Sequence, residues 1–81
     1  LEATNYLSTK KINAVAIDGP SIDSAIDSDF SVHKVLLKNN IIIIENLCNL
    51  SQINKKNFKL IAIPLKLHRA SGSPIRALAI V

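Results

Sequence analysis

A histidine and a glutamate twelve positions apart are the pair in this sequence most able to do chemistry together. His33 lies near the start of S-V-H-K-V-L-L-K, a segment with apolar residues at helical spacing, and Glu45 directly follows four isoleucines. Imidazole nitrogen and carboxylate oxygen are both ligands of divalent metal ions. If the helix packs back beside the following strand, the two side chains can meet at a metal. Alternatively, helix and strand are ordinary core elements, and Glu45 accepts hydrogen bonds from local backbone.

The elements that must position this pair are a helix and a strand. Isoleucine is β-branched and favours strands, so residues 41–44 predict a strand that is buried on both faces. A charged side chain directly after such a strand costs free energy unless a partner neutralises it, which singles out Glu45. Ser31 is the predicted N-cap of a helix over residues 32–38, and the two asparagines that follow are expected to end that helix.

Three further strands are predicted from apolar runs. They cover residues 12–17, 58–67 and 75–81, and polar segments rich in Gly, Pro, Ser or Asn separate them. Because residues 41–44 and 60–63 are both near-continuous apolar runs, we expect them to form adjacent, buried strands. Four strands with short helical links predict an α/β fold within a single domain over residues 1–81.

Length and composition narrow the class of protein. The chain has 81 residues, of which 48% are hydrophobic, so it predicts a globular core. No apolar run approaches the ~20 residues that span a bilayer, so we expect no membrane partner. Cys48 is the one cysteine and lies in the apolar phrase L-C-N-L, which predicts a buried thiol in a cytoplasmic protein. Because the first residue is Leu rather than Met, we expect a piece of a longer polypeptide.

The charge of the chain is unevenly distributed. The net charge is +4, and the eight Lys and Arg residues after Phe30 outnumber the single acid there. A basic half can indicate nucleic acid. Here the basic residues are scattered over predicted turns and strand ends, and no aromatic platform for stacking bases accompanies them. The sequence therefore favours a solvated lysine surface over a nucleic-acid partner.

Several phrases, taken in order, resemble the C-terminal half of a known family. They are I-D-G-P-S-I-D, S-V-H, I-I-I-I-E-N-L, L-I-A-I-P-L-K-L and G-S-P-I-R-A-L-A-I. This order and spacing is similar to that of the cyclase family, which includes bacterial kynurenine formamidase and isatin hydrolase. The resemblance implies a fragment of a swivelling β/β/α domain, and metal-dependent hydrolysis of amides or lactams.

The resemblance also implies roles for individual residues. The main His and Asp metal motif of the family lies in its N-terminal half, and nothing here matches that motif. His33 and Glu45 stand where the family supplies a further histidine and a downstream glutamate, so they are the expected metal ligands. Asp18 and Ser21 match an Asp-x-x-Ser phrase and would line the pocket or brace the ligands. A turn that merely stops a strand explains Asp18 and Ser21 equally well.

The resemblance implies a metal-dependent amide hydrolase, in which a zinc- or manganese-activated water attacks the carbonyl of a small-molecule substrate. It identifies no catalytic residue beyond the expected ligands. Because the main motif is missing, we expect the isolated chain to be inactive. The expected partner is the missing N-terminal half or a second copy in a homo-oligomer. The alternative is a non-catalytic, oligomeric binding module that keeps the fold.

Overall fold

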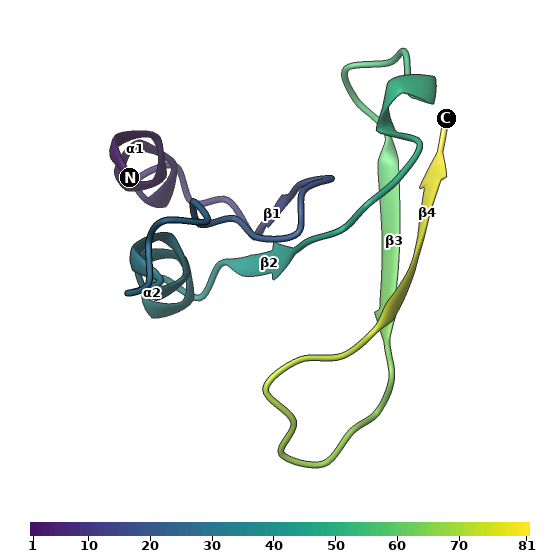
Figure 1. The fold of residues 1–81 in the computed structure, drawn as a ribbon. Coiled ribbons are helices and arrows are strands. Elements are labelled where there is room, and N and C mark those ends of the chain that lie inside the picture. Colours follow the sequence, from purple (N-terminus) through teal and green to yellow (C-terminus); the bar gives the residue numbers. More distant parts are fainter. The chain divides into compact units, whose positions relative to one another are not determined.

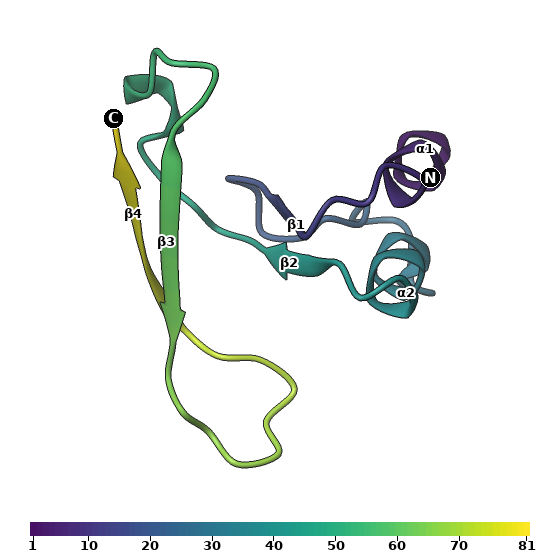
Figure 2. The same cartoon turned by 180° about the vertical axis from the view of Figure 1, so that it is seen from behind.

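The computed structural model describes residues 1–81, which divide into two units. The N-terminal unit is Leu1–Cys48, and the hairpin unit is Asn49–Val81. The chain forms two helices and four strands, with a short 3₁₀ turn in the hairpin unit. Figures 1 and 2 draw these elements from two opposite sides. The predicted α/β class, with about four strands and short helices, is thus confirmed. No helix of the chain has the length and apolar character needed to cross a membrane.

The N-terminal unit contains helix α1 (Glu2–Ser8), strand β1 (Ala14–Ala16), helix α2 (Ser31–Lys38) and strand β2 (Ile42–Ile44). β1 and β2 pair in parallel, and α2 lies in the connection between them (Figure 1). A parallel pair needs such a crossover, because a tight hairpin can join only antiparallel strands.

Backbone pairing continues past the C-terminal ends of β1 and β2. The Ile17 N–H donates to the carbonyl of Ile44 at 2.9 Å, and the Asn46 N–H donates to the carbonyl of Gly19 at 2.8 Å. The segment that follows β1 therefore runs beside Glu45, the residue directly after β2. This pairing places the candidate site at the carboxyl ends of two parallel strands, where α/β folds commonly bind ligands.

The core of the N-terminal unit is small. Leu36 of α2 and Ile41, just before β2, are buried, and α1 packs against α2. Ile42 is 60% exposed and the next two isoleucines are partly exposed, so the prediction of a strand buried on both faces is wrong. β2 pairs only with β1, and this leaves one edge of the strand open.

Two further local predictions are corrected by the structure. Ser31 is the first residue of α2 rather than its N-cap, and the N-cap position belongs to Phe30 in a left-handed conformation with φ 54°. No local side chain caps the helix, because a carboxylate from an earlier loop takes that role. Cys48 is exposed rather than buried, since it lies in irregular chain beyond β2.

The hairpin unit contains the 3₁₀ turn η1 (Leu50–Gln52), strand β3 (Lys59–Pro64) and strand β4 (Ile75–Ile80). β3 and β4 form an antiparallel pair in which Ile61 lies opposite Leu78. Within the units β2 pairs with β1 and β3 pairs with β4. The expected adjacency of residues 41–44 and 60–63 stays a prediction. Pro64 ends β3, which is one of the positions that a strand proline tolerates.

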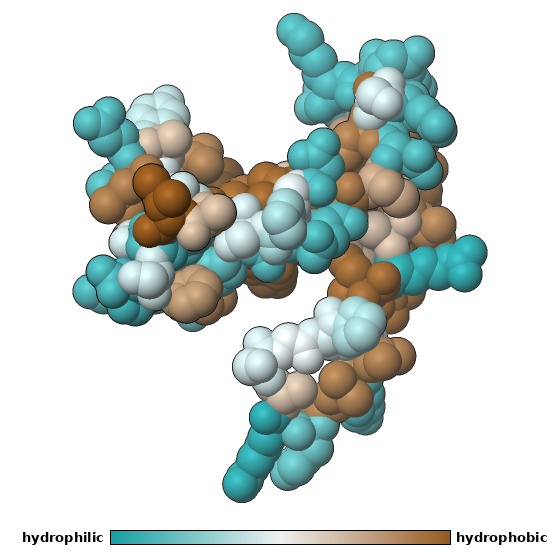
Figure 3. All heavy atoms as spheres, viewed as in Figure 1, coloured by the Kyte–Doolittle hydropathy of each residue, from teal (hydrophilic) through white to brown (hydrophobic).

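The hairpin unit has no buried side chain. Apolar side chains stand at its surface along both strands (Figure 3). The large exposed ones in and beside the strands are Phe58, Leu60, Ile61, Ile63, Leu65, Leu67, Leu78, Ile80 and Val81. A two-stranded hairpin without a covered apolar face is only marginally stable in water.

Candidate metal site

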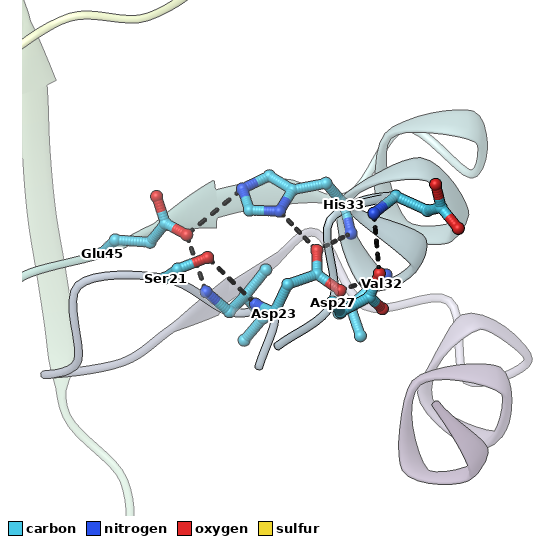
Figure 4. A network of polar contacts seen from close by, with 8 residues as sticks. Ser21, Asp23, Asp27, Val32, His33 and Glu45 are labelled. Carbon is cyan, nitrogen blue, oxygen red and sulfur yellow. Dashed lines mark hydrogen bonds and ion pairs between the residues drawn. The ribbon is translucent and has the colours of Figure 1, made fainter. Parts of the chain in front are cut away.

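His33 and Glu45 meet in the structure. His33 projects from the first turn of α2, and Glu45 follows the last residue of β2. The His33 Nε2 lies 3.2 Å from the Glu45 Oε2 (Figure 4), and both side chains are 25% exposed. The expectation that helix and strand bring these two side chains together is confirmed, while their role as metal ligands stays a prediction.

Asp23, which the sequence did not single out, lies behind His33. One oxygen of its carboxylate, Oδ1, accepts the Val32 N–H at 2.7 Å, and the other, Oδ2, accepts the His33 N–H at 2.9 Å. The His33 Nδ1 lies 2.7 Å from the same Oδ2. Asp23 therefore caps α2 from nine residues away along the chain and also holds the His33 ring (Figure 4).

The environment of Asp23 acts on its pKa in two directions. Burial of the carboxylate, which is 2% exposed, raises the pKa. The hydrogen bonds from the backbone and ring of His33 and from the Val32 N–H lower the pKa, as does the nearby imidazole charge. The hydrogen bonds and the charge prevail, so the pKa of Asp23 lies below its ordinary value and the group is a carboxylate at neutral pH.

Glu45 has a second contact besides His33. Its Oε2 also accepts the Ile22 N–H at 2.8 Å, which ties the loop after β1 to the end of β2. The Ser21 Oγ accepts the Asp23 N–H at 3.1 Å within the same loop. The Glu45 carboxylate thus bonds backbone that is distant in sequence rather than local, and it also faces the histidine. Its role as a metal ligand stays a prediction.

Ser21 is linked to the candidate site by a hydrogen bond, and Asp18 is not. Ser21 braces the backbone of Asp23, which in turn holds His33, so it supports the site from behind. Asp18 is exposed, and no hydrogen bond or ion pair joins it to His33 or Glu45. Their predicted role in a substrate pocket remains a prediction.

The arrangement of one imidazole between two carboxylates limits the states of His33. Since ionised carboxylates only accept hydrogen bonds, the Nδ1 that faces Asp23 must carry a hydrogen. The Nε2 then either carries a second hydrogen, which Glu45 accepts, or presents a lone pair beside the Glu45 oxygen. In the second arrangement the Nε2 lone pair and the Glu45 oxygen stand side by side as two potential ligands of one metal ion.

The donor set fits a divalent metal ion in kind and in spacing. Two neighbouring ligands of one ion, each bound at ~2.0–2.2 Å, lie about 3 Å apart, and the His33 Nε2 and Glu45 Oε2 are 3.2 Å apart. No group of three or more His, Cys, Asp or Glu residues in the chain could hold an ion. A metal ion held here would need ligands in addition to these two side chains.

The fold identifies a class of protein. One solved structure, a potential metal-dependent hydrolase with cyclase activity, matches 95% of this chain and 37% of its own length, with a TM-score of 0.85 and 35% identity. Another, a predicted metal-dependent hydrolase from Bacillus stearothermophilus, has a TM-score of 0.82 and 35% identity over the same fractions. No protein-family model matches the chain.

Comparison of the sequence with curated proteins gives a more specific similarity than the solved structures do. The kynurenine formamidase of Polaromonas naphthalenivorans is 42% identical over 72 residues, which are 89% of this chain and 32% of the relative. That of Bacillus cytotoxicus is 36% identical over 77 residues, or 95% of this chain and 36% of the relative. The chain is therefore similar to bacterial kynurenine formamidases, and it spans about a third of the length of these relatives.

Proposed function

We propose that this chain is the C-terminal part of a metal-dependent amide hydrolase that resembles kynurenine formamidase, and that His33 and Glu45 are two of its metal ligands. The observation that carries the proposal is the 3.2 Å approach of the His33 Nε2 to the Glu45 Oε2, with the opposite ring nitrogen held by Asp23. A carboxylate–histidine–metal arrangement of this kind recurs in metal sites, because the carboxylate fixes the ring and raises its basicity.

The proposed hydrolysis follows from the kind of metal ion that these donor groups can bind. A bound zinc or manganese ion would supply a lowered pKa for water and a polarised amide carbonyl. His33 and Glu45 together bring one negative charge to the ion, and both are a quarter exposed, so solvent and a small substrate can reach them. The Ile22 N–H fixes the Glu45 carboxylate in position. The substrate class is the formamide of an aromatic amine or a cyclic amide.

We propose further that the rest of the protein covers the hairpin unit. The chain spans about a third of the relatives that it matches, and the apolar side chains of β3 and β4 lack a cover within the chain. Exposed apolar surface of this kind marks an interaction site. The N-terminal portion of the hydrolase would supply both this cover and the missing ligands. A second copy of the chain is the alternative occupant, and it would favour a non-catalytic oligomer.

A complementation experiment tests the proposal. The chain alone should not hydrolyse N-formylkynurenine, and addition of the N-terminal portion of a kynurenine formamidase should give turnover that a chelator removes. His33→Ala and Glu45→Gln should each reduce that turnover to the level of the chain alone. His68→Ala is the matched control, because His68 lies exposed in the turn between β3 and β4.

Two results would contradict the proposed function. Turnover by the complemented protein that survives both His33→Ala and Glu45→Gln would remove these residues from the metal site. Metal-dependent turnover by the 81 residues alone would show that the chain needs no further ligands. Self-association of the chain without any gain of activity on complementation would favour the binding module instead.

A further inference from the structure

The buried carboxylate of Asp23 is the group that touches both the backbone of α2 and the ring of His33. Two backbone N–H groups, of Val32 and His33, and the ring nitrogen Nδ1 of His33 converge on its two oxygens. The side chain is 2% exposed, so water cannot replace any of these donors without a rearrangement. These contacts determine which ring nitrogen of His33 carries hydrogen and which keeps a lone pair.

We propose that Asp23 is a positioning residue that holds neutral His33 in the tautomer with hydrogen on Nδ1, so that the Nε2 lone pair faces Glu45 and can bind the metal ion. This inference deepens the proposed function and rests on it. Asp23 itself binds no metal, because the helix and the ring use both of its oxygens.

The tautomer follows from the hydrogen-bond inventory. Backbone N–H groups can only donate, so both Asp23 oxygens must act as acceptors toward Val32 and His33. A protonated acid would direct its own O–H toward one of these donors. The oxygen at 2.7 Å from the His33 Nδ1 is therefore an acceptor, and Nδ1 supplies the hydrogen. In a neutral ring the lone pair then belongs to Nε2.

An amide cannot replace this carboxylate without losing a contact. In Asp23→Asn, an NH₂ group must occupy the place of one carboxylate oxygen. Facing Val32, the NH₂ would oppose a backbone donor; facing His33, it would oppose a backbone donor and favour a bare Nδ1. The substitution is nearly isosteric, so it changes the hydrogen-bond pattern more than the packing.

Other contacts hold Asp23 and the ring in place without selecting the tautomer. The Ser21 Oγ accepts the Asp23 N–H, which fixes the loop from which the carboxylate projects. The Phe30 and His33 rings meet nearly at right angles, with centroids 5.7 Å apart and planes at 84°. The Nδ1 of His33 has Asp23 as its hydrogen-bond partner. The choice between the two ring nitrogens thus belongs to Asp23.

Nitrogen NMR of the metal-free protein in mildly alkaline buffer tests the proposal directly. Long-range ¹H–¹⁵N correlations distinguish a protonated from a bare ring nitrogen, and the chain has only two histidines, so His68 serves as an internal reference. The expected result is hydrogen on Nδ1 and a bare Nε2 at His33. Asp23→Asn should abolish this preference. Asp27→Asn is the matched control, because Asp27 caps the Asp29 N–H in the same loop without touching His33.

Metal binding by the protein complemented with its N-terminal portion gives the second readout. Loss of such an outer partner weakens metal binding ~10–100-fold, so Asp23→Asn should lower the affinity for Zn²⁺ by that factor and Asp27→Asn should leave it unchanged. His68 should keep its tautomer in every variant. If Asp23→Asn fails to fold, the wild-type spectrum alone decides the tautomer.

The outcomes separate this proposal from the proposed function. Hydrogen on Nε2 with a bare Nδ1 in wild-type His33 would overturn the positioning role, whatever the metal affinity. A changed tautomer in Asp23→Asn with unchanged Zn²⁺ affinity would also overturn it. Hydrogen on Nδ1 in a protein that binds no Zn²⁺ would instead overturn the metal site and leave the tautomer assignment standing.

Discussion

The two units of the chain differ in where their apolar side chains lie. The N-terminal unit buries Leu36 and Ile41 and carries a connected polar cluster built on Asp23, His33 and Glu45. The strands of the hairpin unit are also rich in apolar residues, but none of these side chains is buried. Both ion pairs lie in the N-terminal unit. The candidate site, whose side chains must keep fixed positions, thus stands on the unit with a core. The unit without a core leaves its apolar side chains exposed.

The largest expected effect is a loss of stability when the core of the N-terminal unit is truncated. Leu36→Ala removes the most buried large side chain of the N-terminal unit, so the free energy of unfolding should fall by ~2–5 kcal/mol. Ile63→Ala alters a side chain that is 65% exposed, so its effect should stay within about 0.5 kcal/mol. Urea unfolding followed by circular dichroism measures both. Equal effects would show that the hairpin has a core of its own in solution.

A charge placed on the hairpin unit tests whether its apolar face is an interface. Ile63→Lys places a cation on an apolar sheet face that we propose is covered by the rest of the protein, so association should weaken at least about tenfold. The control is Ile26→Lys, because Ile26 is 94% exposed in a loop of the N-terminal unit. Sedimentation with and without the N-terminal portion measures association. Equal weakening by both variants would remove the hairpin from the interface.

The sequence predicted the elements better than it predicted their surroundings. Apolar runs located all four strands. Burial and pairing partners were less predictable, because a run such as residues 41–44 is apolar whichever strand it pairs with. Its exposure depends on what covers the sheet, which the composition of the run does not determine.

The candidate site shows the same limit at the level of single residues. The pair of His33 and Glu45 could be found because their types and their positions beside a helix and a strand are local features. Asp23 could not, since its link to α2 depends on how the loop after β1 folds back. Ser31 and Asp29 stand nearer the helix start and are equally good capping residues by type. Only the three-dimensional pairing of β1 with β2 selects Asp23.

The smallest expected effect concerns the serine that supports Asp23. Ser21→Ala removes the acceptor of the Asp23 N–H in a partly buried turn, so unfolding should become easier by ~0.5–1 kcal/mol. Ser24→Ala is the matched control, because the Ser24 Oγ accepts the Ile26 N–H at 3.4 Å in an exposed turn, where water can replace it. The same urea experiment compares the two variants. If they prove indistinguishable, Ser21 is an ordinary turn residue, and the support of Asp23 comes from its contacts with α2 alone.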